Sequence, residues 1–425
     1  MYVDKETSEV RYLQAFDFVL FALFMAVSAG IGVFYAIRAK RQGTSNRDYL
    51  LGNQELHVLP VAIAMVLSLA SATSMLGMPA EVYMGGIEYI YVIAGVAVAL
   101  LIAGWQFVPL FYDLKLTSSL EYLELRFKSK AAKLTATILI IIQSLFYLAV
   151  VMYSPSVALE AVTGFPVWLS ILCVLVVSTI YTALGGLRAV VLTDAVQMVV
   201  IVSGFLALII QGTVEVGGMD KVFDISRAGG RLEQIHFDFD LRVRHSFWSL
   251  VLGSAPQILV FSAVNPASVQ RYKAVPTLTK ARLVVFGSLL IWVVYISLVS
   301  LTGLVIFAYY SSKQCDPLRA NYLKNINQIV PYYLMDTLYY PGVPGIYLAS
   351  LFSGTLSSTS AVQVALAAVT WEDLLKAKYG HISERRKVVV CQCLVIFYGI
   401  ISAGLAFMIG VVKGTTVIQV KSNKK

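Results

Sequence analysis

The chain has 425 residues, of which 58% are hydrophobic and 13% charged, and its mean hydropathy is +0.76. This composition excludes a soluble globular domain, in which about 25% of the residues are charged. The formal net charge of +9 does not indicate a nucleic-acid-binding protein either, because the basic residues are spread over many short loops and form no single patch. The sequence is therefore typical of a polytopic membrane protein.

Apolar runs of roughly 20 residues, the length that crosses about 30 Å of hydrocarbon, recur along nearly the whole sequence. They predict an all-α fold with ten transmembrane helices. The first run follows a mixed-charge segment and is long enough to span, so we expect it to stay as a helix and not to be a cleaved signal peptide. The predicted spans are 14–37, 57–79, 88–112, 133–158, 166–184, 187–211, 246–268, 283–309, 342–370 and 388–412.

The distribution of Lys and Arg predicts how these helices are oriented. If the N-terminus lies outside the cell, the inside loops hold 19 of the 33 basic residues. Cytoplasmic loops of membrane proteins carry such an excess. We therefore expect an extracellular N-terminus, and we expect the two longer loops, 212–245 and 310–341, to lie outside.

Two of the predicted spans are interrupted. Small and hydroxyl residues occupy the second span between Ser68 and Ser74, and the seventh span contains Gly253 and Pro256 and ends near Pro266. Lipid cannot satisfy polar side chains or unwound backbone, so such interruptions occur mainly where they line a cavity or bind an ion. Two interrupted helices at matching positions indicate the binding site of a secondary transporter.

The spacing of these interruptions predicts an internal repeat. The two broken helices lie five spans apart along the chain, so each would be the first helix of a five-helix repeat, and the odd offset gives the repeats opposite orientations. The predicted organisation is a single transmembrane domain of residues 1–425. It comprises an extra N-terminal helix in 1–45, a first repeat in 46–211 and a second, incomplete repeat in 246–420.

A hydroxyl-rich run from Ser353 to Ser360 lies in the ninth span. Sodium is a hard cation that prefers oxygen ligands, and neutral hydroxyls with exposed carbonyls can replace its hydration shell without adding a fixed charge. The run therefore predicts a cation site facing the interrupted second span. The alternative is that the hydroxyls bond back to carbonyls of their own helix or hold neighbouring helices together.

The junction of the fifth and sixth spans holds an acidic residue. Gly185 and Gly186 allow a tight turn, and Asp194 follows within the sixth span. An ionisable side chain at this depth is a candidate for a role in an ion path or gate. Two other readings stay open, namely stabilisation of a helix N-terminus and an ion pair with Arg188.

These motifs resemble those of the solute:sodium symporters. The resemblance is closest to the branch that holds the sodium-coupled monocarboxylate transporters, the sodium-dependent multivitamin transporter and the sodium-iodide symporter, and its motifs run in family order from about residue 14 to 420. The motifs that carry it are the hydroxyl-rich run with its tail Ala367-Ala368-Val369-Thr370-Trp371-Glu372-Asp373-Leu374, the junction Leu184-Gly185-Gly186-Leu187-Arg188-Ala189-Val190-Val191-Leu192-Thr193-Asp194, Val269-Gln270-Arg271-Tyr272, Cys315-Asp316-Pro317-Leu318 and Pro341-Gly342-Val343-Pro344-Gly345.

The resemblance implies a five-plus-five inverted-repeat transporter core with sodium as the coupling ion and no other cofactor. It places the hydroxyl pair Ser357 and Ser358 at the shared sodium site, with facing carbonyls from Leu67, Ala70 and Gly354. It implies pocket positions for Ser71, Ser74 and Tyr147. Ser262 stands where relatives often carry an aromatic residue, so we expect it to affect substrate choice. Asp194 is expected on the ion path.

The resemblance also implies that the family continues beyond the end of this chain. Its last residues, Thr415 to Lys425, stand where relatives enter further spans. We therefore expect the last core helix to be missing, as in a C-terminally truncated form.

The leading functional hypothesis is sodium-coupled symport of a small organic monoanion, such as a monocarboxylate or a vitamin-like carboxylate, across the plasma membrane. Two alternatives within the family are transport of an iodide-like inorganic anion and a non-transporting, regulatory membrane protein. A third, an intramembrane serine hydrolase, needs a base within about 3 Å of its nucleophile. The histidines that could serve as this base lie in loops or at span edges, so the sequence disfavours a hydrolase. They are His57, His236, His245 and His381.

Overall fold

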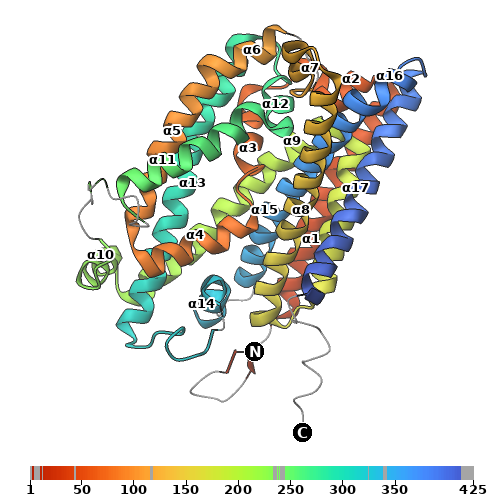
Figure 1. Ribbon diagram of the computed structural model, residues 1–425. Coiled ribbons are helices and arrows are strands. Elements are labelled where there is room, and N and C mark those ends of the chain that lie inside the picture. The colour runs from red at the N-terminus through yellow and green to blue at the C-terminus, as the bar shows by residue number, and fades with distance from the viewer. Residues whose placement is uncertain are drawn as a thin grey trace.

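The computed structural model describes residues 2–3, 10–11, 13–42, 45–114, 118–232, 237, 239, 245–323, 325–337 and 342–412. The described residues form an all-α fold (Figure 1), apart from an antiparallel pair of two-residue strands, β1 (Tyr2–Val3) and β2 (Val10–Arg11). The chain is a multi-pass membrane protein. Its long, apolar helices carry the passes, and the start of α1 and the end of α17 lie at the same end of the molecule.

The membrane-spanning elements are α1 (Ala15–Gln42), α3 (Val58–Leu67), α4 (Ala72–Gly85), α5 (Val92–Ile102), α8 (Lys130–Thr163), α9 (Val167–Val216), α11 (Phe247–Leu259), α13 (Leu278–Ser312), α15 (Val343–Val369) and α17 (Glu384–Val412). The shorter helices are α2 (Asn46–Leu51), α6 (Val108–Asp113), α7 (Glu121–Phe127), α10 (Met219–Ala228), α12 (Pro266–Tyr272), α14 (Ile329–Thr337) and α16 (Lys376–Tyr379). Tighter or wider turns are η1 (Gly52–Gln54), η2 (Ile87–Tyr91), η3 (Ala103–Phe107), η4 (Val260–Val264), η5 (Ile326–Gln328) and η6 (Thr370–Leu375).

The 50-residue helix α9 is two membrane passes joined by a reversal at Gly186, which has φ 59° and ψ −156°. Phe165, just before α9, packs against Phe18 near the start of α1. Gly185 approaches Tyr35 near the end of α1, and Gly204 approaches Ser350 near the start of α15. Because α9 crosses and returns, the described residues make ten passes, which confirms the predicted all-α topology.

The second pass is broken where the sequence predicts. Helix α3 ends at Leu67 and α4 begins at Ala72. The seventh pass differs from the prediction at Gly253 and Pro256 and agrees with it near Pro266. Helix α11 runs unbroken through Gly253 and Pro256, continues through the wide turn η4, and breaks only at Asn265, whose ψ of 130° ends the helical backbone.

Helix α2 meets α3 at a bend of 110°. Three consecutive residues at this bend have left-handed backbone conformations, namely Gly52 (φ 57°), Asn53 (φ 55°) and Gln54 (φ 61°). Gln54 has no special tolerance for this region, so the bend is held by its surroundings. Its Nε2 donates to the carbonyl of Lys273 at 3.1 Å, and the backbone nitrogen of Leu56 donates to the carbonyl of Ala274 at 3.1 Å.

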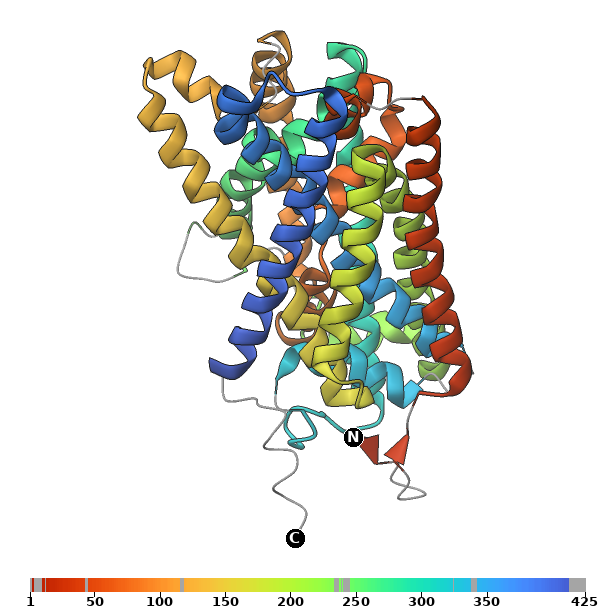
Figure 2. The same cartoon turned by 90° about the vertical axis from the view of Figure 1, so that its right-hand side faces the viewer.

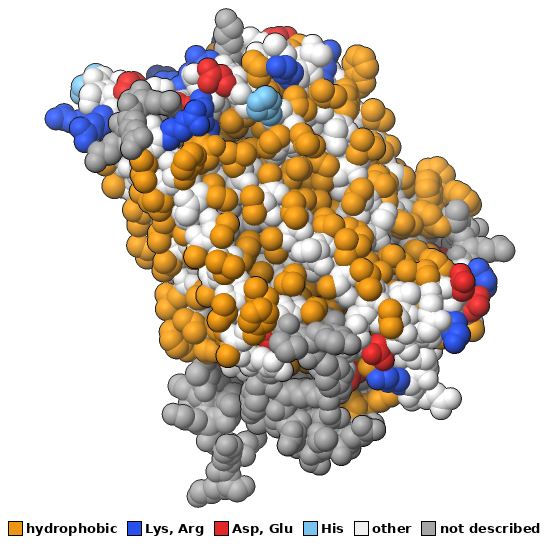
Figure 3. Space-filling view, turned by 180° about the vertical axis from the view of Figure 1, so that it is seen from behind, with side chains coloured by type: hydrophobic (Ala, Val, Ile, Leu, Met, Phe, Trp, Pro, Cys, Tyr) orange, Lys and Arg blue, Asp and Glu red, His pale blue; other side chains and the backbone are white. Residues whose placement is uncertain are grey.

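Helix α15 lies at the centre of the bundle and is almost entirely buried, whereas α8 is mostly exposed along its outer face. Helices α1, α9 and α17 run side by side along one flank (Figure 2), and each of the three also packs against α15 or its neighbours. Hydrophobic side chains cover a broad band of the outer surface, and charged side chains gather toward its two ends (Figure 3). This pattern fits a helical bundle in a bilayer.

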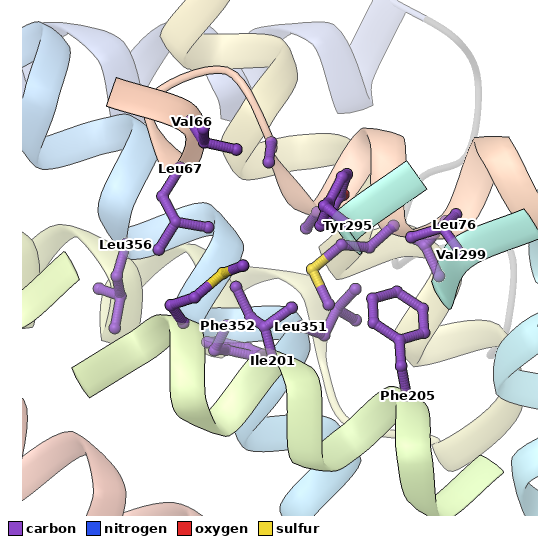
Figure 4. Close-up of a cluster of buried hydrophobic side chains, with 14 of the residues drawn as sticks. Val66, Leu67, Leu76, Ile201, Phe205, Tyr295, Val299, Leu351, Phe352 and Leu356 are labelled. Atoms are coloured by element: carbon purple, nitrogen blue, oxygen red, sulfur yellow. The ribbon is translucent and has the colours of Figure 1, made fainter. Parts of the chain in front are cut away.

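Apolar side chains fill the space around the break between α3 and α4. Leu67 lies near Leu356 and Phe352 of α15, and Ile201 of α9 projects toward the same cluster (Figure 4). These side chains exclude water from most of the break, so any polar atom there needs a protein partner or a ligand.

We expect Gly186→Ala to lower the stability of the fold. A Cβ at this position would lie 2.6 Å from the carbonyl oxygen of Tyr49, and the backbone is left-handed. The cost should be about 1–3 kcal/mol, seen as a lower midpoint of thermal unfolding in detergent. Gly404→Ala is the matched control, because nothing lies within 4 Å of its Cβ position. Equal midpoints for the two variants would contradict the tight reversal.

Candidate functional site

The break between α3 and α4 frees a carbonyl at membrane depth. In a continuous helix the backbone nitrogen of Ser71 would donate to the carbonyl of Leu67. Here it donates to the carbonyl of Leu69 at 2.9 Å, and Ala70 donates to Val66 at 2.9 Å. The Leu67 carbonyl is left to accept from outside its own helix, and its side chain is fully buried.

The hydroxyl-rich run of α15 divides into two groups. Ser353, Thr355, Thr359 and Ser360 donate to carbonyls three or four residues earlier, at 2.7 to 3.3 Å. These four hydroxyls follow the structural alternative considered for the run. The helix stays regular throughout, so no unwound carbonyl comes from this part of α15.

Ser357 and Ser358 form the second group, because their hydroxyls leave the helix. The Oγ of Ser358 donates to the carbonyl oxygen of Leu67 at 3.2 Å. The Oγ of Ser357 donates to Oδ1 of Asp194 at 2.6 Å. The pair singled out by resemblance is therefore the pair that joins α15 to the break and to α9.

Gly354 sets how closely α15 approaches the break. A Cβ at this position would lie 2.8 Å from the sulfur of Met75 and 3.0 Å from the backbone nitrogen of Ala72. Ala72 is the first residue of α4, and Ala70 is fully buried beside it. Leu67, Gly354 and Ser358 thus lie where α15 meets the break, Ala70 lies within the break, and Ser357 contacts α9.

Asp194 forms a buried ion pair with Arg271. The Nη2 of Arg271 donates to Oδ2 of Asp194 at 3.2 Å, and both side chains are fully buried. The Nη1 of Arg271 donates to the carbonyl of Ala267 at 3.2 Å. The pair connects the second pass of α9 with α12, the short helix that follows the broken seventh pass.

Arg188 is not the partner of Asp194. Its guanidinium instead binds Asp48 at 2.9 Å and Glu55 at 3.0 Å, so it ties the reversal of α9 to the segment around α2. Sequence reasoning missed Arg271, although it stands within the motif Val269–Tyr272. The sequence feature that could have indicated Arg271 is a basic residue that closely follows an interrupted membrane span.

Further polar atoms surround this pair without direct partners. In the part of the chain that the structure describes, Nε of Arg271 and both amide atoms of Gln197 are buried and make no hydrogen bond. Gln197 lies one turn after Asp194 and is fully buried. The hydroxyl of Tyr181 donates to the carbonyl of Leu356 at 2.9 Å. Such orphaned polar groups are costly at this depth unless water or an ion reaches them.

A cavity of about 310 Å³ adjoins the break on the side of α12. It lies between α8, α11, α12 and α15, and none of its described lining residues is charged. The polar residues in its lining are Ser68, Gln143, Ser144, Tyr147, Gln257, Asn265 and Ser268.

The residues predicted for substrate binding do not all line this cavity. Tyr147 does, and its hydroxyl lies 3.5 Å from the carbonyl of Ser68 and near the hydroxyls of Ser71 and Ser358. The hydroxyl of Ser74 instead lies 2.8 Å from that of Tyr295 on α13. Ser262 is buried within η4. A substrate role for Ser71, Ser74 and Ser262 stays a prediction.

Residues 49–421 match the model of a family described as the Sodium:solute symporter family. The chain is 38% identical over 399 residues to the sodium-coupled monocarboxylate transporter 2 of Mus musculus, covering 93% of this chain and 64% of that one. It is 39% identical over 393 residues to the sodium-dependent multivitamin transporter of Oryctolagus cuniculus, covering 92% of this chain and 61% of that one. The chain therefore spans less than two thirds of the length of these relatives, which are transporters and not enzymes.

The fold is similar to that of a Na⁺-coupled sialic acid symporter solved in a substrate-bound, outward-open state. The TM-score is 0.82, and the match covers 94% of this chain and 83% of that chain at 20% sequence identity. The likeness establishes that the two share a fold.

We expect Asp194 and Arg271 to be strongly coupled in stability. Removing one partner, in Asp194→Asn or Arg271→Met, leaves the other buried without its counter-charge and should cost about 3–5 kcal/mol. The double variant should cost much less than the sum of the two, as measured by thermal unfolding. Arg319→Gln, which breaks an exposed pair with Asp316, is the control and should change little. Additive effects at Asp194 and Arg271 would contradict the coupling.

Proposed function

This chain belongs to the sodium:solute symporter family, and we propose that it moves sodium down its gradient together with a small organic monoanion across the plasma membrane. The observation that carries the proposal is a pair of hydroxyls on α15 that donate to other segments of the chain. Ser357 and Ser358 donate to oxygen atoms outside α15, whereas the other four hydroxyls between residues 353 and 360 donate to carbonyls of their own helix.

The oxygen atoms around the break suit sodium. A carbonyl from Leu67 and hydroxyls from Ser357 and Ser358 are neutral oxygen ligands of the kind that a hard monovalent cation prefers. The carbonyl of Ala70 in the break would add a further ligand, and so would the carbonyl of Gly354, although it stays within the regular helix α15. The hydrogen bond from Ser358 to Leu67 already brings two of these oxygens within 3.2 Å of each other.

Asp194 would serve as a step on the ion path. Its carboxylate accepts from Ser357 and is neutralised by Arg271. A sodium ion that leaves the site would replace Ser357 or Arg271 as a partner of Asp194. The buried charge of the carboxylate would therefore stay compensated throughout. The polar atoms of Gln197 lie one turn further along the same helix.

The neutral cavity beside the break would hold the organic anion. Amide and hydroxyl groups of Gln143, Ser144 and Gln257 can donate to a carboxylate. Tyr147 lies between this cavity and the sodium ligands, because its hydroxyl is near both Ser68 and Ser358. Occupancy of either site would therefore affect the other, which is the requirement for coupling.

The proposed topology follows from the two broken passes. The proposed division is an extra N-terminal helix in 1–45, a first repeat in 46–211 and an incomplete second repeat in 246–420, whose residues 413–420 lie outside the described part of the chain. The end of the molecule that carries α2, α7, α12 and α16 faces the cytoplasm, and the N-terminus faces outside. The excess of basic residues in the loops at that end supports this orientation.

We expect the double variant Ser357→Ala and Ser358→Ala to lower sodium affinity by on the order of tenfold or more, because two cation ligands are lost. The readout is the sodium-dependent rise in the thermal unfolding midpoint, with choline as the reference cation. Ser353→Ala is the matched control, since that hydroxyl donates only to the carbonyl of Ala349 in the same helix. A double variant that responds to sodium as the control does would contradict the assignment.

Uptake into proteoliposomes or cells tests the transport reaction itself. We expect labelled short-chain monocarboxylates or biotin to accumulate with sodium outside and not with choline outside. Accumulation of iodide without organic anions would favour the inorganic-anion alternative. Sodium binding without uptake of any of these solutes would favour a regulatory role.

A further inference from the structure

A second polar cavity, of about 520 Å³, lies at the end of the molecule where α2, α7 and α16 gather (Figure 1). Its walls come from α2, η1, the end of α6, the residue after α12, η6, α16 and the start of α17. It shares no lining residue with the neutral cavity beside the break. No step of the proposed transport reaction uses it.

The lining of this cavity is rich in cations. Arg47, Lys273, Lys376 and Lys387 are opposed by two carboxylates, Glu372 and Glu384. Asn46, Gln54 and Tyr112 add neutral polar groups. The buried ring of Trp371 lies at its edge.

Both carboxylates already have partners. Glu372 binds Lys376 at 2.6 Å, and Glu384 binds Lys387 at 2.7 Å while accepting from the backbone nitrogen of Asn46 at 3.0 Å. Two cations therefore balance two carboxylates within the lining. Arg47 and Lys273 supply the remaining net positive charge.

Arg47 and Lys273 make contacts with neutral oxygens. The guanidinium of Arg47 donates to Oε1 of Gln54, and Nζ of Lys273 donates to the carbonyl of Phe111 at 3.1 Å. Lys273 is 3% exposed, so the structure holds an ammonium group almost entirely out of water. A buried cation of this kind is stabilised when an anion joins it.

We propose that this cavity binds an anion bearing phosphate groups. A single carboxylate would satisfy one cation, whereas phosphate oxygens can accept from an arginine fork and from several ammonium groups at once. The volume accommodates a group with more than one phosphate. The two possible sources are the headgroup of an anionic lipid and a soluble phosphate compound, since the cavity lies at the end of the bundle where headgroups meet water.

Such an anion would join segments that flank both broken passes. Arg47 precedes α3, and Lys273 follows α12. Lys376 and Lys387 belong to the segments that follow α15. The bound anion would hold these segments together and stabilise the arrangement seen here.

The electrostatics of Lys273 are consistent with this role. Lys273 lies outside the membrane-spanning helices, and burial lowers its pKa to about 8. Glu121 on α7 raises the pKa and Arg47 on α2 lowers it further. A doubly charged anion beside the ammonium group would oppose the effects of burial and of Arg47.

The test uses the full chain in nanodiscs and measures the midpoint of thermal unfolding. One arm titrates inorganic pyrophosphate into phosphatidylcholine nanodiscs, and the other replaces part of the phosphatidylcholine with a phosphatidylinositol phosphate. We expect at least one arm to raise the midpoint. A rise with pyrophosphate identifies a soluble ligand, and a rise with the lipid alone identifies a headgroup.

The double variant Arg47→Gln with Lys273→Met should weaken the response by on the order of tenfold or more. The control is Arg227→Gln with Arg319→Gln, which removes the same charge from exposed positions at the opposite end of the molecule. If the double variant does not fold, Arg47→Gln alone gives the same comparison at a smaller effect. No rise in either arm, or an equal rise in the Arg47 variant and the control, would overturn the proposal.

The pH dependence supplies a second measurement. Sulfate, whose charge stays constant near neutral pH, should bind more weakly as the pH rises through about 8, because Lys273 then loses its proton. Lys273→Met should remove this dependence while leaving binding through Arg47. A sulfate affinity that is independent of pH in the unmodified chain would overturn the assignment of Lys273.

Discussion

The structure depends on one constraint, which is that a carbonyl freed within a membrane needs a partner. The break between α3 and α4 leaves the Leu67 carbonyl without its helical donor, because Ser71 turns to Leu69. Lipid offers no replacement. The hydroxyl of Ser358 supplies one, and Gly354 brings α15 close enough for the contact to form. The small residues of α15 are thus required by the geometry of a different helix.

The same helix, α15, also contacts the buried ion pair between Asp194 and Arg271. Ser357 joins α15 to Asp194 on α9, and Arg271 joins Asp194 to α12. The central helix α15, the second pass of α9 and the short helix after the broken seventh pass are therefore linked through three neighbouring side chains. A buried ion pair adds little to the stability of a fold, but the loss of one partner alone is strongly destabilising. The pair lies where the central helix, α9 and the segment after the broken seventh pass meet, so its loss would affect all three.

Hydropathy alone predicts the ten passes, because each hydrophobic run is long and unambiguous. The break at Ser68–Ser74 is also visible, since hydroxyl residues cluster in an otherwise apolar run. Gly253 and Pro256 predict an interruption inside the seventh pass, yet the helical backbone ends only at Asn265, next to the Pro266 that marks the end of the predicted span. Helix α11 contains Pro256 without a break, and Asn265 caps α12 by accepting from the backbone nitrogen of Ala267. Ser357 and Ser358 could be named only through the family resemblance, because spacing does not separate them from four other hydroxyls nearby. Arg271 could not be assigned to Asp194, because 77 residues separate the two and only the packed fold brings them together.

The bend between α2 and α3 stores backbone strain. Its left-handed residues, Gln54 above all, hold a conformation that costs of order 1–3 kcal/mol for a residue without special tolerance. The contacts from Gln54 to Lys273 and from Arg188 to Glu55 hold the backbone in this conformation. When these contacts part, relaxation of the backbone returns that energy and offsets part of the cost of separating α3 from its neighbours. The strained bend thus lowers the net free energy needed to move the first half of the broken helix.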